Sequence, residues 1–421
     1  MVRLPDRISR DKFKWFLETY ICPMFTGSEV EQAPDVRRSS QLHATRRSPQ
    51  QILVRWARDP GSWQFAIVRS QDFTRSDPKL INAIIRNVYA ASGLLKRFGW
   101  ADIVEPSLRK AIAEQVAPSR CSGLIADLIR CFEQWSEQTY EGRPISAAVG
   151  LDPEQVARKS SVTIDVLGEP YGLVMASGLD SILVVNRNRQ VVHRVTLSPT
   201  EIGREIRAPL RFVALAHWAR DKRTALSLTR LGEILLFRDG SLAFAKRRGT
   251  WCHFPHNAII SRARINKRFD SALIEAVLNS CLDVSFAKTG GGVGIVSRRA
   301  RELISKAEMV KPKDRLSGHG NKAQFLRSMV SGKKFQSLDR KTRMDLMAID
   351  GSMILLRDGT IYAVGAIIKI KAGSAGGGRE AAARTAARYG LGIKVSSDGK
   401  ISGFWRDNPR QRKSDVRFVV G

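Results

Sequence analysis

The amino-acid sequence predicts an α/β (α+β) protein, with an α-rich region first, a β-rich region in the middle and an alternating region last. Three observations predict this fold class. Residues 76–138 place apolar side chains at helical spacing, and residues 151–265 carry short β-branched runs broken by Gly, Asn and Asp. The last hundred or so residues alternate between the two patterns. Such alternation is typical of a sheet covered by helices.

The first 150 residues are predicted to be mainly helical. Residues 26–51 are polar and rich in turn-forming residues, so we expect a loop or linker there. One helix is predicted to start at 76–77, where Ser76 or Asp77 can cap it, and two more at 105–117 and 122–138. A single strand is predicted in the apolar stretch at 63–70.

Residues 151–265 are predicted to form a β-rich region. The runs between 160 and 197 indicate a strand meander. Asp239-Gly240 separates two apolar runs and is typical of a hairpin turn. Cys252, His253 and His256 lie close together, but their spacing matches no standard zinc finger, so we expect a turn among aromatic residues.

Residues 266–408 are predicted to form an α/β domain, followed by a loose basic tail at 409–421. A helix at 268–288 leads through a Gly-rich stretch into a strand and a further helix. Asp358-Gly359 and Asp398-Gly399 each lie between strand-like runs, as hairpin turns do. An Ala-rich helix lies between these two hairpins.

The composition is that of a soluble globular protein with a strong positive charge. The net charge is +30, and residues 1–150 hold 22 Lys and Arg against 16 Asp and Glu, which leaves 48 against 24 for the remainder. A basic surface attracts polyanions such as nucleotides or nucleic acid. No apolar run reaches the roughly 18 residues of a membrane helix, and the first residues lack a signal-peptide core. We therefore expect a cytoplasmic protein with no membrane span.

One motif of the last region combines an acid with a glycine. Asp350-Gly351 comes before a strand instead of lying inside a hairpin. An acid in that place can meet a ligand, and the glycine lets the ligand approach the backbone. The alternative is a plain turn with a solvated Asp.

A second motif places arginine after a run of small residues. Gly377-Gly378 opens the Ala-rich helix, Arg379 lies in its first turn and Arg384 lies beyond. Unpaired backbone N–H groups at a helix start suit phosphate, and arginine adds charged donors. The alternative is a flexible loop before a surface helix.

The order of these motifs resembles that of the diadenylate cyclase domain, the nucleotide-binding domain of DNA-integrity-scanning and membrane-linked cyclases. The similarity runs from about Phe269 to Trp405. Residues 1–265 resemble, more weakly, the candidate sensor regions ahead of such domains in DACNV-type proteins. The resemblance implies a mixed sheet flanked by helices at the end of the chain, and a sensor role for the regions before it.

The resemblance also implies roles for individual positions. The family's D-G-A motif corresponds to Asp350-Gly351-Ser352, in which the acid binds a divalent metal, Mg²⁺ or Mn²⁺, and activates the ribose hydroxyl. The family's strand-entry glycine corresponds to Gly294, and Ser396 belongs to the equivalent of its V-S-E-E-T-G motif. These positions are expected to contact the nucleotide.

The family's phosphate-clamping G-T-R-H-R motif is only partly kept. It corresponds to the run Gly377-Gly378-Arg379-Glu380-Ala381, so the first Arg survives, while Gly, Glu and Ala replace the Thr, the His and the second Arg. Each charge-assisted hydrogen bond to a phosphate contributes roughly 1.5–3 kcal/mol, and Glu380 would repel a phosphate at the same place. The neighbouring cations that could compensate are Arg384, Arg388 and Lys371.

The sequence therefore predicts a diadenylate cyclase-like nucleotidyltransferase that condenses two ATP molecules to cyclic di-AMP. The reaction requires a homodimer, and the preceding regions would control it. Because the Arg motif is incomplete, a catalytically degenerate nucleotide-binding sensor is the alternative. The net charge of +30 keeps a nucleic-acid-binding protein open as a third possibility.

Overall fold

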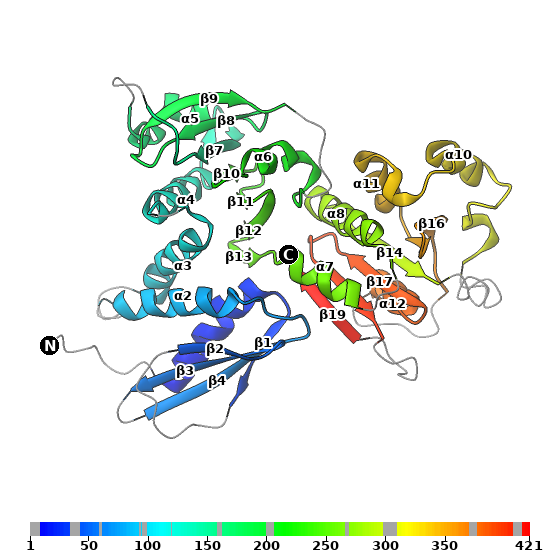
Figure 1. Cartoon of the computed structure of the whole chain (residues 1–421), viewed down its shortest axis with the longest axis horizontal. Coiled ribbons are helices and arrows are strands. Elements are labelled where there is room, and N and C mark those ends of the chain that lie inside the picture. The colour runs from blue at the N-terminus through cyan, green and yellow to red at the C-terminus, as the bar shows by residue number, and fades with distance from the viewer. Residues whose placement is uncertain are drawn as a thin grey trace. The chain divides into compact units, whose positions relative to one another are not determined.

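The chain is an α/β protein made of two compact units (Figure 1). The first unit comprises Met1–Ala208 and Phe212–Pro255, and the second comprises Pro209–Arg211 and His256–Gly421. The computed structural model describes residues 9–33, 43–58, 61–91, 94, 99–118, 120–157, 162–198, 206–265, 269–297, 310–369, 377–406 and 415–421. Within these ranges, no helix has both the length and the apolar character needed to cross a bilayer.

The first unit begins with a short helix packed on a four-stranded antiparallel sheet of order β1-β4-β3-β2. Its elements are α1 (Arg10–Phe16), a π-helical turn (Leu17–Ile21), a 3₁₀ turn (Cys22–Phe25), β1 (Ser28–Gln32), β2 (His43–Ser48), β3 (Gln51–Arg58) and β4 (Gly61–Arg69). The predicted loop over 26–51 is therefore wrong for β1 and β2. Both are edge strands that expose most of their side chains, so their polar sequences hide the alternation that marks a strand.

Three helices follow the sheet, namely α2 (Asp77–Ala91), α3 (Trp100–Val116) and α4 (Ser122–Ser136). The predicted helix start at 76–77 is confirmed, since α2 begins at Asp77, and α3 begins at Trp100 instead of 105. Gly99 precedes α3, and its N–H donates to Asp102 Oδ2 at 2.9 Å. This reach of an acidic side chain back to the start of the helix explains why α3 begins before Pro106.

A mixed seven-stranded sheet of order β13-β12-β11-β10-β7-β8-β9 completes the first unit. Its strands are β7 (Ala147–Leu151), β8 (Ser181–Val185), β9 (Val191–Thr196), β10 (Thr224–Leu228), β11 (Ile234–Arg238), β12 (Ser241–Arg247) and β13 (Thr250–His253). The expected boundary between residues 150 and 151 passes through β7. The smaller elements nearby are β5 (Thr139–Tyr140), β6 (Arg143–Pro144), α5 (Pro170–Ala176) and α6 (Val213–Trp218).

In this sheet the predicted hairpin is confirmed, whereas the predicted strand meander is wrong where a helix forms instead. Asp239 and Gly240 join β11 to β12 with φ values of 50° and 72°, as a tight hairpin turn requires. The predicted strand meander, by contrast, begins with a 3₁₀ turn (Ile164–Gly168) and α5 before the β8–β9 hairpin. A Cβ at Gly172 would collide with the carbonyl group of Val166, so this glycine allows the tight turn between them.

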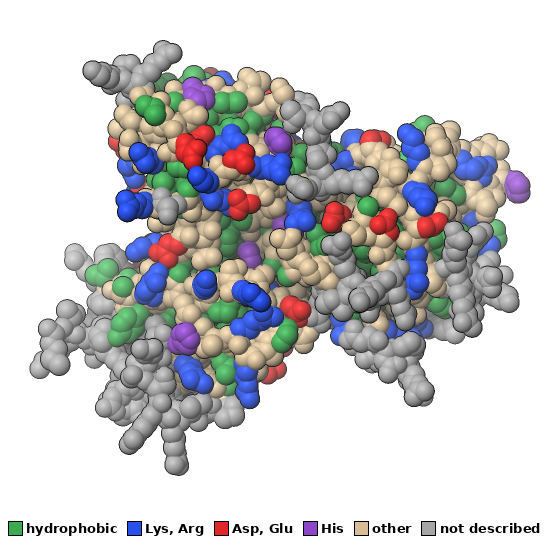
Figure 2. All heavy atoms as spheres, viewed as in Figure 1, with side chains coloured by type: hydrophobic (Ala, Val, Ile, Leu, Met, Phe, Trp, Pro, Cys, Tyr) green, Lys and Arg blue, Asp and Glu red, His purple; other side chains and the backbone are tan. Residues whose placement is uncertain are grey.

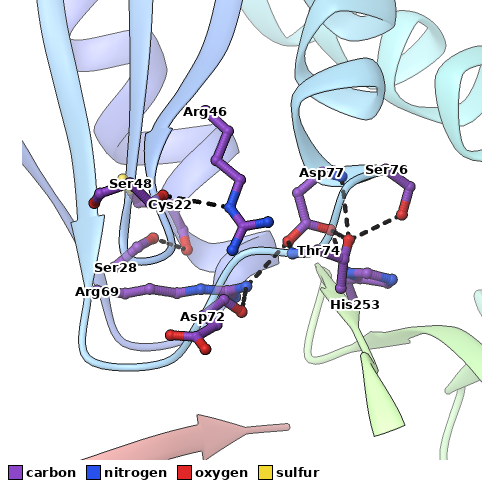
Figure 3. Close-up of polar contacts among 10 residues, drawn as sticks. All are labelled: Cys22, Ser28, Arg46, Ser48, Arg69, Asp72, Thr74, Ser76, Asp77 and His253. Carbon is purple, nitrogen blue, oxygen red and sulfur yellow. Dashed lines mark hydrogen bonds and ion pairs between the residues drawn. The ribbon is translucent and has the colours of Figure 1, made fainter. Parts of the chain in front are cut away.

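A buried polar cluster joins the loop before α2 to β13 (Figure 3). Asp77 accepts hydrogen bonds from Arg69 Nη2 at 3.0 Å and from the Thr74 N–H at 2.8 Å, and its side chain is fully buried. His253 Nδ1 lies 3.4 Å from Asp77 Oδ1, and its ring stacks on Phe244 at 4.9 Å. Removing one partner from such a buried ion pair typically costs about 3–5 kcal/mol. The cluster therefore fixes β13 against the start of α2.

This cluster predicts that the first unit loses stability in mild acid. Burial lowers the pKa of His253 and the nearby Arg69 lowers it further, although Asp77 opposes this. The unfolded chain, with an ordinary histidine pKa of about 6.5, then takes up more protons than the folded unit as the pH falls. We expect the free energy of unfolding to fall below about pH 6.5, and to fall less in His253→Gln.

Urea unfolding between about pH 7.5 and 5 measures this difference. The control is His43→Gln, which changes an exposed histidine of the same unit. Equal pH dependence in wild type and His253→Gln would contradict the assignment.

The second unit is built on a mixed six-stranded sheet of order β16-β15-β14-β17-β18-β19, which confirms the sheet flanked by helices expected for this region. Only the β14–β15 pair is parallel. The strands are β14 (Gly291–Val296), β15 (Ser352–Leu356), β16 (Ile361–Ala366), β17 (Gly390–Val395), β18 (Ile401–Trp405) and β19 (Asp415–Val420). The helices are α7 (His256–Ile265), α8 (Ser271–Ala287), α10 (Asn321–Val330), α11 (Arg340–Ala348) and α12 (Gly377–Ala386).

Most predictions for this unit are confirmed. The helix at 268–288 is α8, and Asp358-Gly359 and Asp398-Gly399 lie in the β15–β16 and β17–β18 hairpins. The predicted loose tail is wrong for residues 415–420, which pair with β18 as β19. The helix expected after β14 falls largely outside the described residues.

Glycines let the helices lie close to both faces of this sheet. A Cβ at Gly294 would lie 2.7 Å from Ala386 Cβ of α12, and one at Gly392 would collide with the carbonyl group of Ala383. A Cβ at Gly291, on the opposite face of β14, would lie 2.5 Å from the carbonyl oxygen of Met347 in α11. The sheet thus has α12 on one face and α8 with α11 on the other.

Candidate functional site

The topology of the second sheet brings several predicted site residues to one edge. Because β14 and β15 are parallel, the segments that lead into them reach the sheet at the same edge. The antiparallel strand β17 ends there too, since Val395 pairs with Gly291. At β15, Ser352 pairs with Ala366, so the end of β16 also lies at this edge.

Asp350 and Arg379 meet at this edge although they are distant in the sequence. Asp350 Oδ1 lies 3.8 Å from Arg379 Nη2. The Asp350 side chain is 91% exposed, whereas that of Arg379 is 37% exposed. The carboxylate comes from the short link between α11 and β15, and the guanidinium comes from the first turn of α12. Both groups therefore remain within reach of a ligand.

The Arg379 side chain lies directly against the backbone of Gly290. Gly290 has a φ of 69°, and a Cβ at this position would collide with Arg379 Nη1 and lie 3.3 Å from the Val395 carbonyl oxygen. The guanidinium is therefore in direct contact with the backbone that enters β14. Sequence reasoning noted the Gly-rich stretch only as a link, and the run of three glycines was the available signal.

Two more glycines shape the acidic side of the site. Gly351 and Gly365 have φ values of 102° and 58°, and a Cβ at Gly351 would lie 2.6 Å from the carbonyl carbon of Gly365. The backbones of Gly351 and Gly365 therefore contact each other next to Asp350. A substitution at either glycine would move the Asp350 carboxylate.

Lys322 is a cation of the site that sequence reasoning missed. Its ammonium group donates to Asp314 Oδ1 at 2.9 Å and to the Gly365 carbonyl oxygen at 3.1 Å. A side chain at Gly365 would meet both Lys322 Nζ at 3.3 Å and the Asp350 carbonyl oxygen at 2.8 Å. Lys322 comes from α10, an amphipathic helix whose pattern gives no hint that it reaches the Asp350 link.

The remaining predicted residues of the edge are placed as follows. Gly377 and Gly378 are exposed at the start of α12, directly before Arg379. Ser396 follows Val395 and its hydroxyl donates to the Lys400 carbonyl within the β17–β18 turn at 3.1 Å. Ser352 is buried, and a Cβ at Gly292 would lie 3.0 Å from its Oγ.

Two predicted residues lie elsewhere. Gly294 is inside β14 beneath α12, where helix packing explains it. Arg384 donates to Glu380 Oε1 at 2.8 Å and lies 4.6 Å above the ring of Phe404. Neither position meets the Asp350–Arg379 pair in the described contacts.

Glu380 is compensated by two cations. It accepts from Arg384 Nε, and its Oε2 accepts from Lys394 Nζ at 3.3 Å. Burial alone would raise the pKa of Glu380, but these two partners outweigh burial and the pKa lies below the usual value. The repulsion of phosphate that the sequence suggested is therefore weakened by the two neighbouring positive charges.

The site suits a hard divalent ion carried by a nucleotide. The residues described contain no group of three or more His, Cys, Asp or Glu side chains that could hold a metal by themselves. Mg²⁺ is commonly bound through one or two carboxylates together with substrate phosphates and water. The single exposed carboxylate of Asp350 fits that pattern, and its ligand atom would be oxygen.

The positive charge is not gathered at this site alone. Figure 2 shows Lys and Arg side chains spread over the visible face of both units, with Asp and Glu side chains among them.

Searches with the sequence match no protein-family model and no curated protein.

The contact between Gly290 and Arg379 generates a test of the site. In Gly290→Ala, the new methyl group would displace the guanidinium from Asp350. We expect the affinity for ATP with Mn²⁺ to fall about ten-fold, as loss of one charge-assisted hydrogen bond implies. Isothermal titration calorimetry measures the change.

The matched control is Gly332→Ala. Gly332 has a φ of 71°, close to that of Gly290, and a Cβ there would meet no atom within 4 Å. Both variants carry the same backbone strain, about 1–2 kcal/mol, but only one reaches Arg379. Equal ATP affinities in the two variants would remove Arg379 from the site.

Proposed function

We propose that the second unit is a nucleotide-binding domain of the diadenylate cyclase type, and that the first unit is its sensory part. One observation carries the proposal: Asp350 and Arg379, the acid and the arginine that the resemblance singles out, approach to 3.8 Å at one edge of the sheet. An exposed acid beside an exposed arginine suits a ligand that brings both phosphate and a divalent ion.

The phosphate side of the proposed site is Arg379 with the start of α12. The guanidinium donates to phosphate oxygens, and the start of α12 at Gly377 and Gly378 lies directly before it in the chain. The positive end of the helix dipole favours the same charge. Gly290 leaves room because no side chain separates Arg379 from the strand entry.

The metal side of the proposed site is Asp350. Its carboxylate would hold Mg²⁺ or Mn²⁺ together with the phosphates of the nucleotide. When bound, such an ion lowers the pKa of a coordinated hydroxyl and stabilises charge on phosphate oxygens. Asp350 also offers an oxygen that can accept the hydrogen of the ribose hydroxyl and orient it.

The proposed reaction joins two ATP molecules held by two copies of the unit. Each ribose 3′-hydroxyl oxygen attacks the α-phosphorus of the other nucleotide and forms a new P–O bond, while the bond from that phosphorus to the bridging oxygen of pyrophosphate breaks and pyrophosphate keeps the electron pair. The hydroxyl proton passes to the Asp350 carboxylate and from there to water. The reaction therefore needs a homodimer. Ile349 precedes Asp350 in the sequence and Ile367 follows Ala366, the partner of Ser352, and both side chains are exposed. They would suit an adenine ring or the apolar part of a partner copy.

The proposal predicts that Asp350 is required for turnover but not for folding. The protein incubated with ATP and Mn²⁺ should form cyclic di-AMP, detected by mass spectrometry, and Asp350→Asn should lower the yield at least a hundred-fold, about 2.7 kcal/mol of lost transition-state stabilisation. Because the pair is exposed, the variant should change the free energy of unfolding by less than about 1 kcal/mol.

Asp358→Asn is the matched control, because Asp358 belongs to another Asp-Gly pair of the same unit that lies in a hairpin turn. It should leave the yield at the wild-type level. A yield from Asp350→Asn equal to that of wild type would refute the assigned role.

A second candidate function is a nucleotide sensor without catalysis. Ala381 stands where the family's second phosphate-binding arginine is expected, and Arg384 is held by Glu380. In that case the positive charge that binds phosphate at the site would come from Arg379. Calorimetry that shows micromolar ATP binding, together with no cyclic di-AMP after prolonged incubation, would favour this candidate over the cyclase.

A further inference from the structure

Asp283 of α8 is a buried carboxylate with three hydrogen bonds. It accepts from Arg340 Nε at Oδ2 and from Arg340 Nη2 at Oδ1, both at 2.8 Å. Its Oδ1 also accepts from the Leu210 backbone N–H at 2.7 Å. The residue is 2% exposed. These hydrogen bonds hold the Asp283 carboxylate in a fixed position, because each lost donor would leave a desolvated oxygen without a partner.

The Asp283–Arg340 pair joins the helix that precedes Gly290 to the helix that precedes Asp350. Arg340 is the first residue of α11, and α11 ends at Ala348, just before Asp350. Asp283 lies in the last two turns of α8. This helix leads through Lys288 to Gly290, whose backbone contacts the Arg379 side chain. The position of Asp350 relative to Gly290, against which Arg379 of α12 lies, therefore depends on how these two helices are held together.

Leu210 brings a third part of the chain to the same carboxylate. Leu210 belongs to the second unit, but Ala208 and Phe212 belong to the first. Close by in the sequence, Arg207 is bound to the β11–β12 hairpin of the first unit: its N–H donates to the Gly240 carbonyl at 3.0 Å, and its carbonyl accepts from the Leu242 N–H at 2.9 Å.

We propose that Asp283 is a positioning residue of the candidate site, and that the nucleotide affinity of the second unit depends on the hydrogen bond between Asp283 and the Leu210 N–H. The inference rests on the proposed nucleotide site. Asp283 touches no ligand in it, and acts by setting α11 against α8.

The electrostatics of Asp283 support this dependence. Burial raises the pKa of Asp283 above its usual value, although Arg340 and the Leu210 N–H both favour the charged form. Loss of the Leu210 N–H would therefore raise the pKa of Asp283 further and leave its carboxylate with one donor fewer beside Arg340. A change at the chain segment 209–211 would then reach Asp350 through α11.

The test removes the Leu210 N–H and leaves Asp283 and Arg340 in place. In the full-length chain, Leu210→Pro deletes the donor, and proline suits this position because Leu210 is the first residue of a 3₁₀ turn. Leu210→Ala is the matched control, since it shortens the side chain but keeps the N–H. Asp283→Asn gives a second perturbation of the same carboxylate.

Two measurements are made on each folded variant, with thermal unfolding as the check of folding. Calorimetry gives the affinity for ATP with Mn²⁺. Hydrogen exchange, measured without nucleotide, reports the opening of residues 288–292 and 347–352 on the two sides of the site. We expect Leu210→Pro and Asp283→Asn to weaken ATP binding about ten-fold and to speed exchange in both segments, with Leu210→Ala close to wild type.

The outcomes separate this inference from the function on which it rests. If wild type binds no ATP, the proposed function fails, while the exchange rates still decide whether Leu210 and Asp283 hold the two segments. If wild type binds ATP and Leu210→Pro matches Leu210→Ala in both affinity and exchange, the inference is overturned and the proposed function stands.

Discussion

The candidate site depends on one constraint, the close approach of backbones where β14 and β15 begin side by side. Parallel pairing brings the two strand entries to one edge of the sheet. At that edge, Gly290 has no side chain to separate Arg379 from the strand, and Gly351 has none to separate Asp350 from β16. Because both glycines have positive φ values, another residue would add strain as well as bulk. The meeting of acid and arginine follows from this geometry.

The ion pairs of this chain have two different roles, and the buried pairs differ in role from the exposed pair. The Arg69–Asp77 and Arg340–Asp283 pairs are buried, so losing one partner would leave an unpaired charge in a desolvated place. They hold loops and helices in fixed positions. The Asp350–Arg379 pair is exposed and its charges are 3.8 Å apart, so solvent screens it and its contribution to stability is small. A pair of that kind is available to a charged ligand.

The changes in the arginine motif become easier to understand in three dimensions. Glu380 points to Arg384 and Lys394, so it forms part of a small charge network on α12 and β17. That network accounts for Arg384, which sequence reasoning had offered as a phosphate ligand. Besides Arg379, Lys322 of α10 approaches the Asp350 link, where Asp314 and the Gly365 carbonyl hold it.

The sequence by itself determined the local elements of this protein: α8, the Ala-rich helix α12 and the hairpins at Asp239, Asp358 and Asp398. Helical spacing and turn chemistry act over a few residues, so they can be seen in the chain alone. Only the tertiary structure decided that the polar segments β1 and β2 and the tail segment β19 form edge strands, and that Arg379 lies against Gly290. These features depend on strand order and on pairing between distant segments, which no short pattern encodes.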